Sequence, residues 1–289
     1  MAKGRELKGR IKSVENTRKI TRTMEMVATS KMKRAQDRVV AARPYANALT
    51  DVISGLYSAE LAERFPLLRQ PSGAAKRAAV IMFTGNRGLA GAFNSNIIKE
   101  SRSLIQKLEA EGTTVEVHAV GKKGLGYLRY VNRPVASSRI DIGDAPTGKI
   151  AAEIVDKLMQ DFAAGTLDAV YVVAARFVSA LSTPATATRV LPVAVPEKKS
   201  GPAPDYILKP SAEAILKELL PSYVRNAVYR AMVDTIAGFY SAQRTAMKNA
   251  TDNAGEMLNI LKRTYNRARQ AQITQEIAEI VGGSAALEG

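Results

Sequence analysis

The longest regular pattern lies in the last third of the chain, where apolar or small residues recur every three or four positions. No proline follows Pro221 and glycine is scarce before Gly282, so residues 211–287 contain little that would end a helix. At ~1.5 Å per residue, about 75 residues form a rod of roughly 110 Å, which cannot bury itself and needs a partner. The predicted inner positions are Met247, Ala250, Ala254, Met257, Leu261, Thr264, Ala268 and Ala271.

Five of these eight inner positions are Ala or Thr, so each turn buries little apolar area. We therefore expect the helix to have more than one partner. The final turns are apolar on more than one side of the helix. A free tip of that kind would be sticky, so the pattern predicts that it lies in a socket. The residues concerned are Ile273, Ile277, Ile280 and Val281.

A second helical pattern occupies about residues 5–61, with Pro44 as its one proline. Its predicted coiled-coil seam consists of Leu7, Ile11, Val14, Ala28, Met32, Ala35, Val39 and Ala42. Arg18, Thr21 and Glu25 interrupt this seam, and we expect Ile20, Met24 and Val27 to carry the apolar face there. Two interpretations stay open: an amphipathic helix whose register drifts, or a helix that changes partner along its length.

Between the two rods the hydrophobic period shortens to that of strands alternating with helices, which predicts a mainly parallel sheet. The expected strands are 78–84, 114–120, 169–177 and 189–195, and the expected helices are 95–111, 122–130 and 148–162. Residues 196–210 are charged and proline-rich and form the expected linker. The predicted fold class is α/β plus a long coiled coil, with two antiparallel terminal helices flanking a Rossmann-like domain. Its expected segments are 1–70, 71–210 and 211–289.

One glycine-rich turn suggests an enzyme, since backbone amides between a strand and a helix can bind phosphate. Gly85, Gly88 and Gly91 have a spacing that fits neither the dinucleotide fingerprint nor the phosphate-binding loop that ends in Gly-Lys-Ser/Thr. No acid follows the next strand to hold a ribose. We therefore favour a turn that lets the helix pack closely on the sheet. His118 is interpreted as a residue of the sheet, and no Ser, His and acid pattern indicates a triad.

Composition narrows the chemistry further. The chain has no Cys and a single His, which excludes disulfides, thiolate sites and clusters of His ligands, and no apolar run is long enough to span a bilayer. The net charge is +15, and thirteen Lys or Arg accompany four acids up to Arg43. This segment is either a solvated face or a surface that docks on an acidic partner such as nucleic acid, an anionic membrane or a protein.

Both ends of the chain resemble one family. LKGRIKSVENTRKITRTMEMVATSKMKRAQ near the start and AMKNATDNAGEMLNILKRTYNRARQAQITQEIAEIVGGSAAL near the end are similar to the gamma subunit of the rotary F-type ATP synthase, as is GNRGLAGAFNSN in the middle. The resemblance implies a subunit without catalytic residues, cofactor or metal. It also implies a shaft that rotates inside a ring of three alpha and three beta subunits and couples proton flow to ATP synthesis or the reverse hydrolysis.

The resemblance further implies partners and sites. The α/β domain would bind the epsilon subunit and the membrane c-ring, and a regulatory inhibitor subunit is a further possible partner. The residues implied as contacts are Arg269, Gln270, Thr274 and Glu276 for the beta-subunit catch, Met24, Lys31, Lys33 and Arg34 for the acidic beta lever, and Tyr206 and Lys209 for the c-ring foot. The start of the chain without a transit peptide leads us to expect a bacterial source and a location on the cytoplasmic face of the inner membrane.

Several positions depart from the family pattern. Asn86 stands where Asp is common, Gly238-Phe239 replaces a Ser-Glu pair, and Leu208 and Lys209 replace Tyr and Glu in the foot. Two other function classes stay open from the residues alone. One is a basic coiled-coil protein that binds nucleic acid, although aromatic residues are only 6% and no nucleic-acid motif is present. The other is a nucleotide-dependent enzyme that uses the glycine-rich turn.

Overall fold

A computed structural model describes residues 2–56, 64–70, 75–194 and 211–287. Its contacts divide the chain into two compact units, one formed by Met1–Val27 with Arg244–Gly289 and the other by Ala28–Gln243. We call them the coiled-coil unit and the α/β unit and describe each by itself. The three-segment division at residues 70/71 and 210/211 stays a prediction, since both boundaries adjoin residues outside the described ranges.

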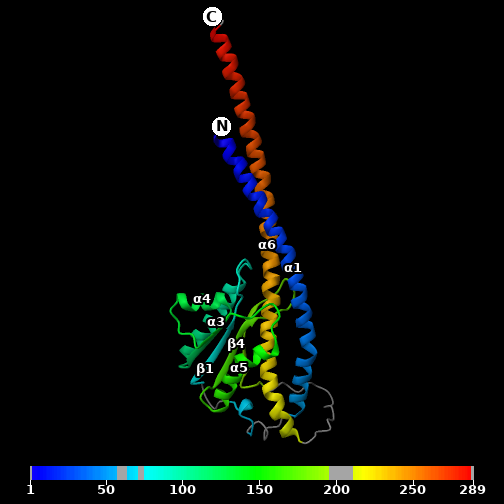
Figure 1. The fold of residues 1–289 in the computed structure, drawn as a ribbon. Coiled ribbons are helices and arrows are strands. Elements are labelled where there is room, and N and C mark those ends of the chain that lie inside the picture. The colour runs from blue at the N-terminus through cyan, green and yellow to red at the C-terminus, as the bar shows by residue number, and fades with distance from the viewer. Residues whose placement is uncertain (1, 57–63, 71–74, 195–210, 288–289) are drawn as a thin grey trace. The chain divides into compact units, whose positions relative to one another are not determined.

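The expected element types form in the expected order (Figure 1). The helices are α1 (Ala2–Leu56), α3 (Phe93–Ala110), α4 (Lys122–Tyr130), α5 (Gly148–Ala163) and α6 (Ala212–Leu287), with a 3-10 turn η1 at Pro66–Leu68. The strands are β1 (Arg77–Phe83), β2 (Thr114–Val120), β3 (Ser137–Arg139), β4 (Ala169–Ala175) and β5 (Ala185–Leu191). Pro44 and Pro221 lie inside α1 and α6, so neither proline ends its helix.

The sheet has the order β3-β2-β1-β4-β5. The first four strands are parallel and β5 runs antiparallel to β4, which confirms a mainly parallel α/β sheet. Two details differ from expectation. The edge strand β3 was not predicted, because three polar residues carry no alternating signal. The last strand spans Ala185–Leu191 rather than 189–195. Its exposed Ala- and Thr-rich start lacks a run of large apolar residues, and Pro192 has no amide to continue the ladder.

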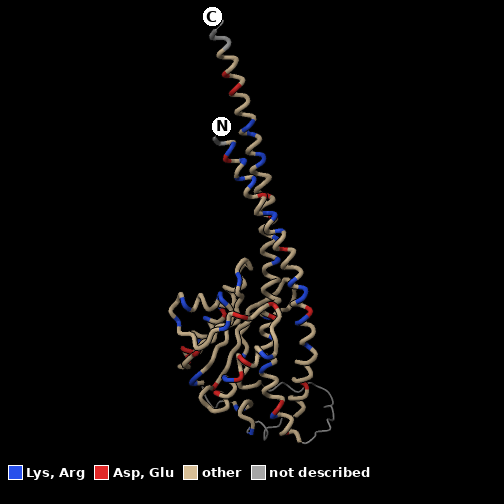
Figure 2. Tube along the Cα trace, in the orientation of Figure 1, with Lys and Arg blue, Asp and Glu red and all other residues tan. Residues whose placement is uncertain are grey.

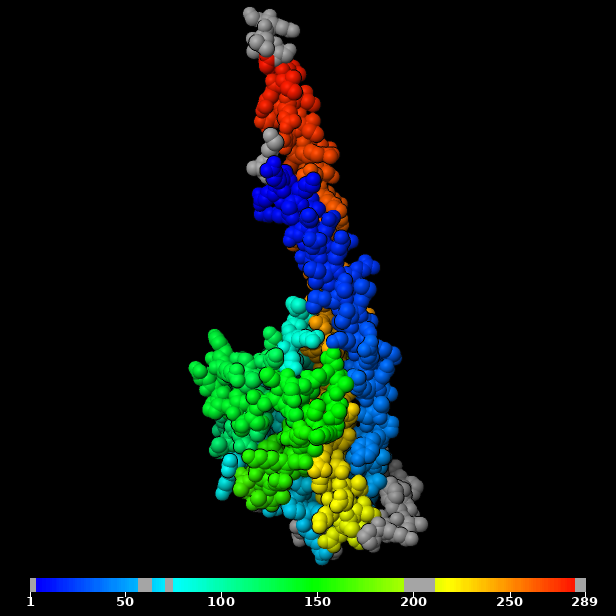
Figure 3. Space-filling model, in the orientation of Figure 1, coloured from blue at the N-terminus to red at the C-terminus, as the bar shows by residue number. Residues whose placement is uncertain are grey.

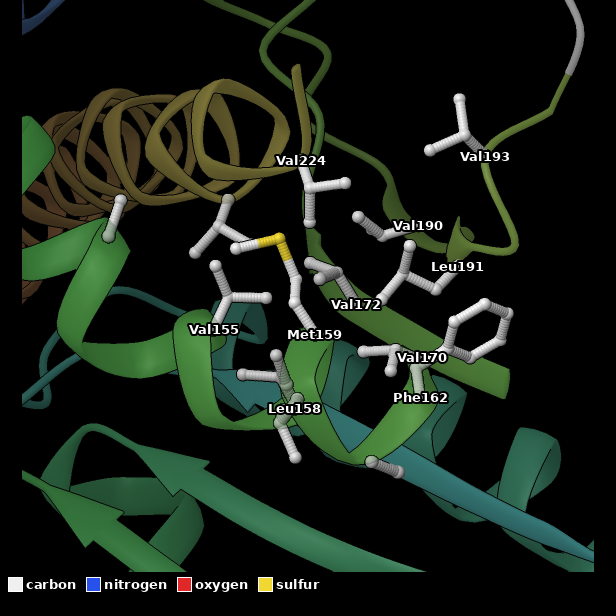
Figure 4. Close-up of a cluster of buried hydrophobic side chains, with 14 of the residues drawn as sticks. Val155, Leu158, Met159, Phe162, Val170, Val172, Val190, Leu191, Val193 and Val224 are labelled. Atoms are coloured by element: carbon white, nitrogen blue, oxygen red, sulfur yellow. The ribbon is translucent and has the colours of Figure 1, made fainter. Parts of the chain in front are cut away.

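Alternate residues of β1 face opposite sides of the sheet, and each side packs against its own layer of helices. Ala79, Ile81 and Phe83 belong to a core that includes α5 and the first half of α6. Figure 4 shows part of this core, with side chains of α5 interleaved with those of β4, β5 and Val224 of α6. The other face of β1 packs on α3 and α4, and Phe239 of α6 joins that second core.

The departure at Gly238 and Phe239 has a packing reason. A Cβ on Gly238 would lie 3.0 Å from Phe93 and 3.2 Å from Ala175, so the absent side chain lets α6 approach the sheet closely. The Phe239 ring packs edge-to-face on Phe93, with centroids 5.7 Å apart. It also lies so close to Gly85 that a Cβ there would be 2.9 Å from the ring. The glycine-rich turn is therefore shaped to receive α6.

The coiled-coil unit pairs α1 and α6 antiparallel, because Thr21 lies at Thr251 whereas the earlier residue Glu15 meets the later residue Lys262. The prediction that Ile20 and Val27 carry the apolar face of α1 was wrong. They are 60% and 51% exposed, whereas Thr21 is 8% exposed. The inner face of α1 keeps its heptad register even where the covered residue is polar, as at Thr21. The partner helix, and not local hydrophobicity, decides which face is covered.

The predicted seam of α6 was correct at Met247, Ala254, Leu261 and Ala268, which are covered, but wrong by one residue at the alternate positions. Met257 is 53% exposed, whereas Leu258 is 3% exposed. Thr264 is likewise exposed and its neighbour Tyr265 is half-buried. Met247 and Ala254 are buried as predicted. The covered positions alternate in steps of four and three residues, at Ala254, Leu258, Leu261 and Tyr265. The small residues beside this seam leave the register unresolved in the sequence.

Candidate functional site

The end of α6 is an uncovered helical surface. From Ile273 to Gly283 every residue is exposed, and Figure 3 shows these turns of α6 continuing beyond the start of α1 within the coiled-coil unit. The exposed large apolar residues are Ile273, Ile277, Ile280 and Val281. An apolar stripe of this extent is typical of an interaction surface, since monomeric proteins seldom leave one in water.

The four catch residues implied by the resemblance lie on this part of α6 and are all exposed. The Thr274 hydroxyl donates back to the Gln270 carbonyl at 3.0 Å, and the Gln272 amide donates to Glu276 at 2.8 Å. These bonds lie within one helix. The side chains are thus displayed together along about two turns, and their contact with a beta subunit stays a prediction.

The basic residues of α1 that the resemblance assigns to the beta lever differ in their contacts. Within the α/β unit, Lys31 donates to Asp144 at 2.7 Å and to the Tyr240 hydroxyl at 3.3 Å, while Tyr240 donates to the same carboxylate. Lys33 is exposed and pairs with Asp37 on its own helix at 3.1 Å. Arg34 is exposed. Figure 2 shows the Lys and Arg positions along α1.

Asp144 thus ties the segment after β3 to α1 and α6. Arg38 adds a bond from its guanidinium to the Asp144 carbonyl oxygen at 2.7 Å. Burial alone would raise the pKa of Asp144, but the hydrogen bonds and charge of Lys31, with the hydroxyl of Tyr240, hold it below its ordinary value. The hydrogen bonds to Asp144 and Tyr240 raise the pKa of Lys31. Lys31 therefore has a structural role in this chain.

The remaining residue of the lever set, Met24, is half-buried in the coiled-coil unit. The c-ring foot residues Tyr206 and Lys209, and Leu208 beside them, lie outside the described residues. None of the contacts implied for these residues is tested by the fold, and they stay predictions.

The amide of Gly85 and the first three amides of α4 are already occupied, because side chains and carbonyls of the segment 84–94 accept from them. The bonds are Gly85 N to Asn94 Oδ1 (2.8 Å), Lys122 N to Asn86 Oδ1 (2.9 Å), Lys123 N to the Gly85 carbonyl (3.2 Å) and Gly124 N to Thr84 Oγ1 (2.9 Å). The start of α4, where an anion would bind, is thus capped internally. This supports the structural interpretation of the turn.

The contacts of Asn86 explain why this chain has Asn where the family commonly has Asp. Its amide nitrogen donates to the carbonyls of Ile140 and Ile142 at 3.0 and 3.2 Å, while its oxygen accepts from Lys122. An Asp at this position would have no donor for the two carbonyls. Asn86 therefore joins the turn after β1, the start of α4 and the segment that leads to Asp144.

His118 behaves as the residue of the sheet that we expected. Its Nδ1 lies 2.7 Å from the Ser137 hydroxyl, on the neighbouring strand β3, and its Nε2 lies 3.4 Å from Glu116. Burial lowers its pKa, in spite of the opposing hydrogen bond to Glu116. In the described part of the chain no group of three or more His, Cys, Asp or Glu side chains is placed to hold a metal ion.

Two residues at the centre of these contacts were not singled out from the sequence. Asp144 follows the short strand β3, and Tyr240 lies in α6 nearly a hundred positions later. The carboxyl ends of parallel strands meet at one edge, which could have drawn attention to an acid after β3. β3 itself left too weak a signal for that step. Among the described helices, none combines the length and hydropathy required to cross a membrane.

The comparisons with known proteins agree with the resemblance. The sequence model of a family described as ATP synthase matches residues 3–287. An ATP synthase gamma chain of Gemmatimonas aurantiaca is 67% identical, with 100% of both chains covered. A gamma chain of Leptospira biflexa is 40% identical, with 99% of this chain and 100% of the relative covered.

Solved structures share the fold. A chain of the Euglena gracilis mitochondrial ATP synthase, in an assembly of OSCP, F1 and c-ring, matches with a TM-score of 0.70 and 19% identity over 99% of this chain and 95% of that one. A chain from the central stalk and c-ring of the Tetrahymena thermophila enzyme matches with 0.61 and 22%, over 80% and 99%. The nucleic-acid-binding alternative gains no support from these matches. The chain belongs to the family of ATP synthase gamma chains.

Proposed function

We propose that the chain is the central-stalk rotor subunit of an ATP synthase. The observation that carries this proposal is 67% identity, over the whole of both chains, to an ATP synthase gamma chain. In this role the chain performs no chemistry. It couples proton flow through a membrane c-ring to ATP synthesis, or hydrolysis in reverse, by rotating within a ring of three alpha and three beta subunits. A rotating asymmetric shaft does this by stabilising different states of each catalytic subunit in turn.

The exposed tip of α6 fits the bearing end of such a shaft. Its apolar side chains, Ile277 and Ile280 among them, are uncovered in the single chain and would be covered inside a sleeve of subunits. We assign the catch contacts with beta-subunit loops to Arg269, Gln270, Thr274 and Glu276, which are exposed together on this stretch.

We assign the contact with the acidic beta lever chiefly to Lys33 and Arg34. Both are exposed, whereas the ammonium of Lys31 is engaged by Asp144 and Tyr240. Exposed positive charges attract an approaching acidic surface and can be reversed without leaving a buried charge unpaired. Lys31 would then support this surface through its bonds to Asp144 and Tyr240, and the lever contact implied for Met24 stays a separate prediction.

The remaining assignments concern the other partners. We propose that the α/β unit binds an epsilon subunit, that a foot including Tyr206 and Lys209 meets the c-ring, and that the chain needs no cofactor. We place the chain at the cytoplasmic face of a bacterial inner membrane. Its 67% and 40% identical relatives from Gemmatimonas and Leptospira support that location.

The proposed lever contact is tested by a double charge reversal, Lys33→Glu with Arg34→Glu, in the assembled complex. We expect ATP-driven proton pumping in inverted vesicles to fall several-fold while the complex still assembles, since reversed charges would repel the acidic lever. The matched control is Lys99→Glu with Arg102→Glu, two exposed bases on α3. Equal pumping by the lever variant and the control would remove the assignment of Lys33 and Arg34.

The rotor proposal has its own test, in which the purified chain is mixed with alpha and beta subunits. We expect a stable complex whose ATPase activity depends on the chain. Tight binding to DNA at physiological salt together with failure to assemble would overturn the rotor proposal.

A further inference from the structure

The loop that joins β4 to β5, residues 176–184, displays two large apolar side chains in water. Val178 is 57% exposed and Leu181 is 91% exposed, the highest value among the large apolar residues that the structure describes. The loop follows a parallel strand at the carboxyl edge of the sheet, where α/β proteins commonly place functional loops. It contributes no residue to the catch, lever or foot contacts.

Two anchors hold this loop against the helices of the α/β unit. Phe177 is buried in one cluster with Val39 of α1 and Ala237 of α6. The Ser241 hydroxyl of α6 donates to the Ala180 carbonyl. Because both ends of the apolar segment are fixed, the exposure of its side chains belongs to an ordered surface.

Hydrogen bonds within the loop close it on itself. The Arg176 amide donates to the Pro184 carbonyl at 2.8 Å, and the Val178 amide donates to the Ser182 carbonyl at 3.2 Å. The Ser179 hydroxyl accepts from the Ser182 amide at 3.1 Å. A loop that is already ordered loses little conformational freedom when a partner binds, which favours recognition.

Positive charge lies beside the two apolar side chains. Burial raises the pKa of Asp234, whereas the charges of Arg230, Arg43 and Arg176 and the amide of Phe177 lower it, so these groups lie near one carboxylate. The three arginines are exposed. Three cations against one carboxylate leave an excess of two positive charges at this place. They come from α6, α1 and the loop itself.

We propose that this surface docks an acidic, amphipathic segment of another subunit, a proposal that rests on the chain's place in an ATP synthase complex. Apolar side chains of that segment would cover Val178 and Leu181, and its carboxylates would meet Arg43, Arg176 and Arg230. A phosphate backbone would leave the two apolar side chains uncovered, so the surface fits a protein better than a nucleic acid.

The proposal is tested by cross-linking. The chain has no cysteine, so Leu181→Cys carries a single benzophenone when it is labelled before assembly with the other purified subunits. We expect a product with one segment that contains both acidic and apolar residues, identified by mass spectrometry. Val178→Cys should reach the same segment. Tyr130→Cys, 84% exposed at the end of α4, is the matched control and should not reach it.

The charge of the surface has its own test. Arg43→Gln with Arg230→Gln, added to Leu181→Cys, should lower the yield of the product several-fold, since the segment's carboxylates lose their partners. Lys99→Gln with Arg102→Gln, two exposed bases on α3, should leave the yield unchanged. A yield that neither pair changes would overturn the proposal.

The outcomes separate this proposal from the rotor function. An assembled, active complex that gives no more of the product from Leu181→Cys than from Tyr130→Cys, or a product with a segment that lacks acids, would overturn the docking proposal alone. Failure of the unmodified chain to assemble would overturn the rotor function. Should the label itself prevent assembly, the rate at which maleimide reacts with unlabelled Leu181→Cys decides. A slower reaction in the complex than in the free chain supports docking, and an equal rate overturns it.

Discussion

The hydroxyl oxygens of Thr21 and Thr251 lie 2.8 Å apart across the two helices of the coiled-coil unit. Thr21 also donates to the carbonyl of Arg18 at 3.1 Å, and Thr251 is within 2.8 Å of the Met247 carbonyl. This polar pair occupies a seam position where an apolar residue would be expected. A buried polar layer of this kind favours one register of a coiled coil at some cost in stability.

The threonine pair should behave as a coupled unit. Thr251→Val removes one partner, and we expect a loss of about 1 kcal/mol in local stability, since Thr21 keeps only its bond to Arg18. The double variant Thr21→Val with Thr251→Val should recover most of that loss, because two valines of similar shape pack without an unpaired hydroxyl. Hydrogen exchange of the α6 amides near Thr251 measures the change in local stability of the single and of the double variant. Losses that simply add would mean that the two hydroxyls are not coupled.

The register of α6 is tested by two neighbouring residues. Leu258→Ala removes a side chain that is 3% exposed and should lower local stability by about 2 kcal/mol. Met257→Ala, at a position that is 53% exposed, should change it by less than about 0.5 kcal/mol. The same exchange measurement compares the two. Equal effects would restore the register that the sequence alone suggested.

Local signals predicted much of the fold. The bounds of α4, Lys122–Tyr130, match the expected helix residue for residue, because Gly121 precedes it and its apolar stripe is short and clear. Both long helices and three strands were also recognisable by their periods. The seam was predictable only in part. Ile20 is more hydrophobic than Thr21, and nothing local shows that α6 covers the threonine.

The contacts that organise the candidate surfaces were less predictable. Lys31 looked like one of three equivalent bases, since its partners Asp144 and Tyr240 are remote in sequence. The sheet order that brings the end of β3 near α1 is a tertiary property with no local signal.

Asp234 should make stability depend on pH. Burial raises its pKa from 3.8 to about 6, only partly offset by the charges of Arg230, Arg43 and Arg176 and a hydrogen bond from the Phe177 amide. A folded-state pKa above the unfolded value means that this group's stabilising contribution is complete below pH ~4 and is lost as pH rises through ~6. Since the carboxyl is partly exposed, we expect the loss to be about 1–2 kcal/mol.

The variant Asp234→Asn should remove this part of the pH dependence. Its thermal midpoint, followed by circular dichroism, should exceed that of the wild type at pH 7 and approach it at pH 4. Asp252→Asn, an exposed carboxyl on the same helix, is the control and should follow the wild-type profile. A wild-type profile that Asp234→Asn leaves unchanged between pH 4 and pH 7 would contradict the prediction.

The close approach of α4 to the end of β1 requires glycine at position 121 but not at position 126. Gly121 has a φ of +105°, and a Cβ there would lie 2.1 Å from the Thr84 carbonyl oxygen. Gly121→Ala should therefore cost at least about 3 kcal/mol, since both the backbone conformation and the lack of space reject a side chain.

Gly126 lies in α4 with no atom within 4 Å of its ideal Cβ. Gly126→Ala should be stabilising by about 0.5–1 kcal/mol, because alanine favours the helix. Thermal melts of the two variants measure this contrast directly. Similar melts would mean that the turn after β1 can move away from α4, which its hydrogen bonds from Gly124 and Lys123 oppose.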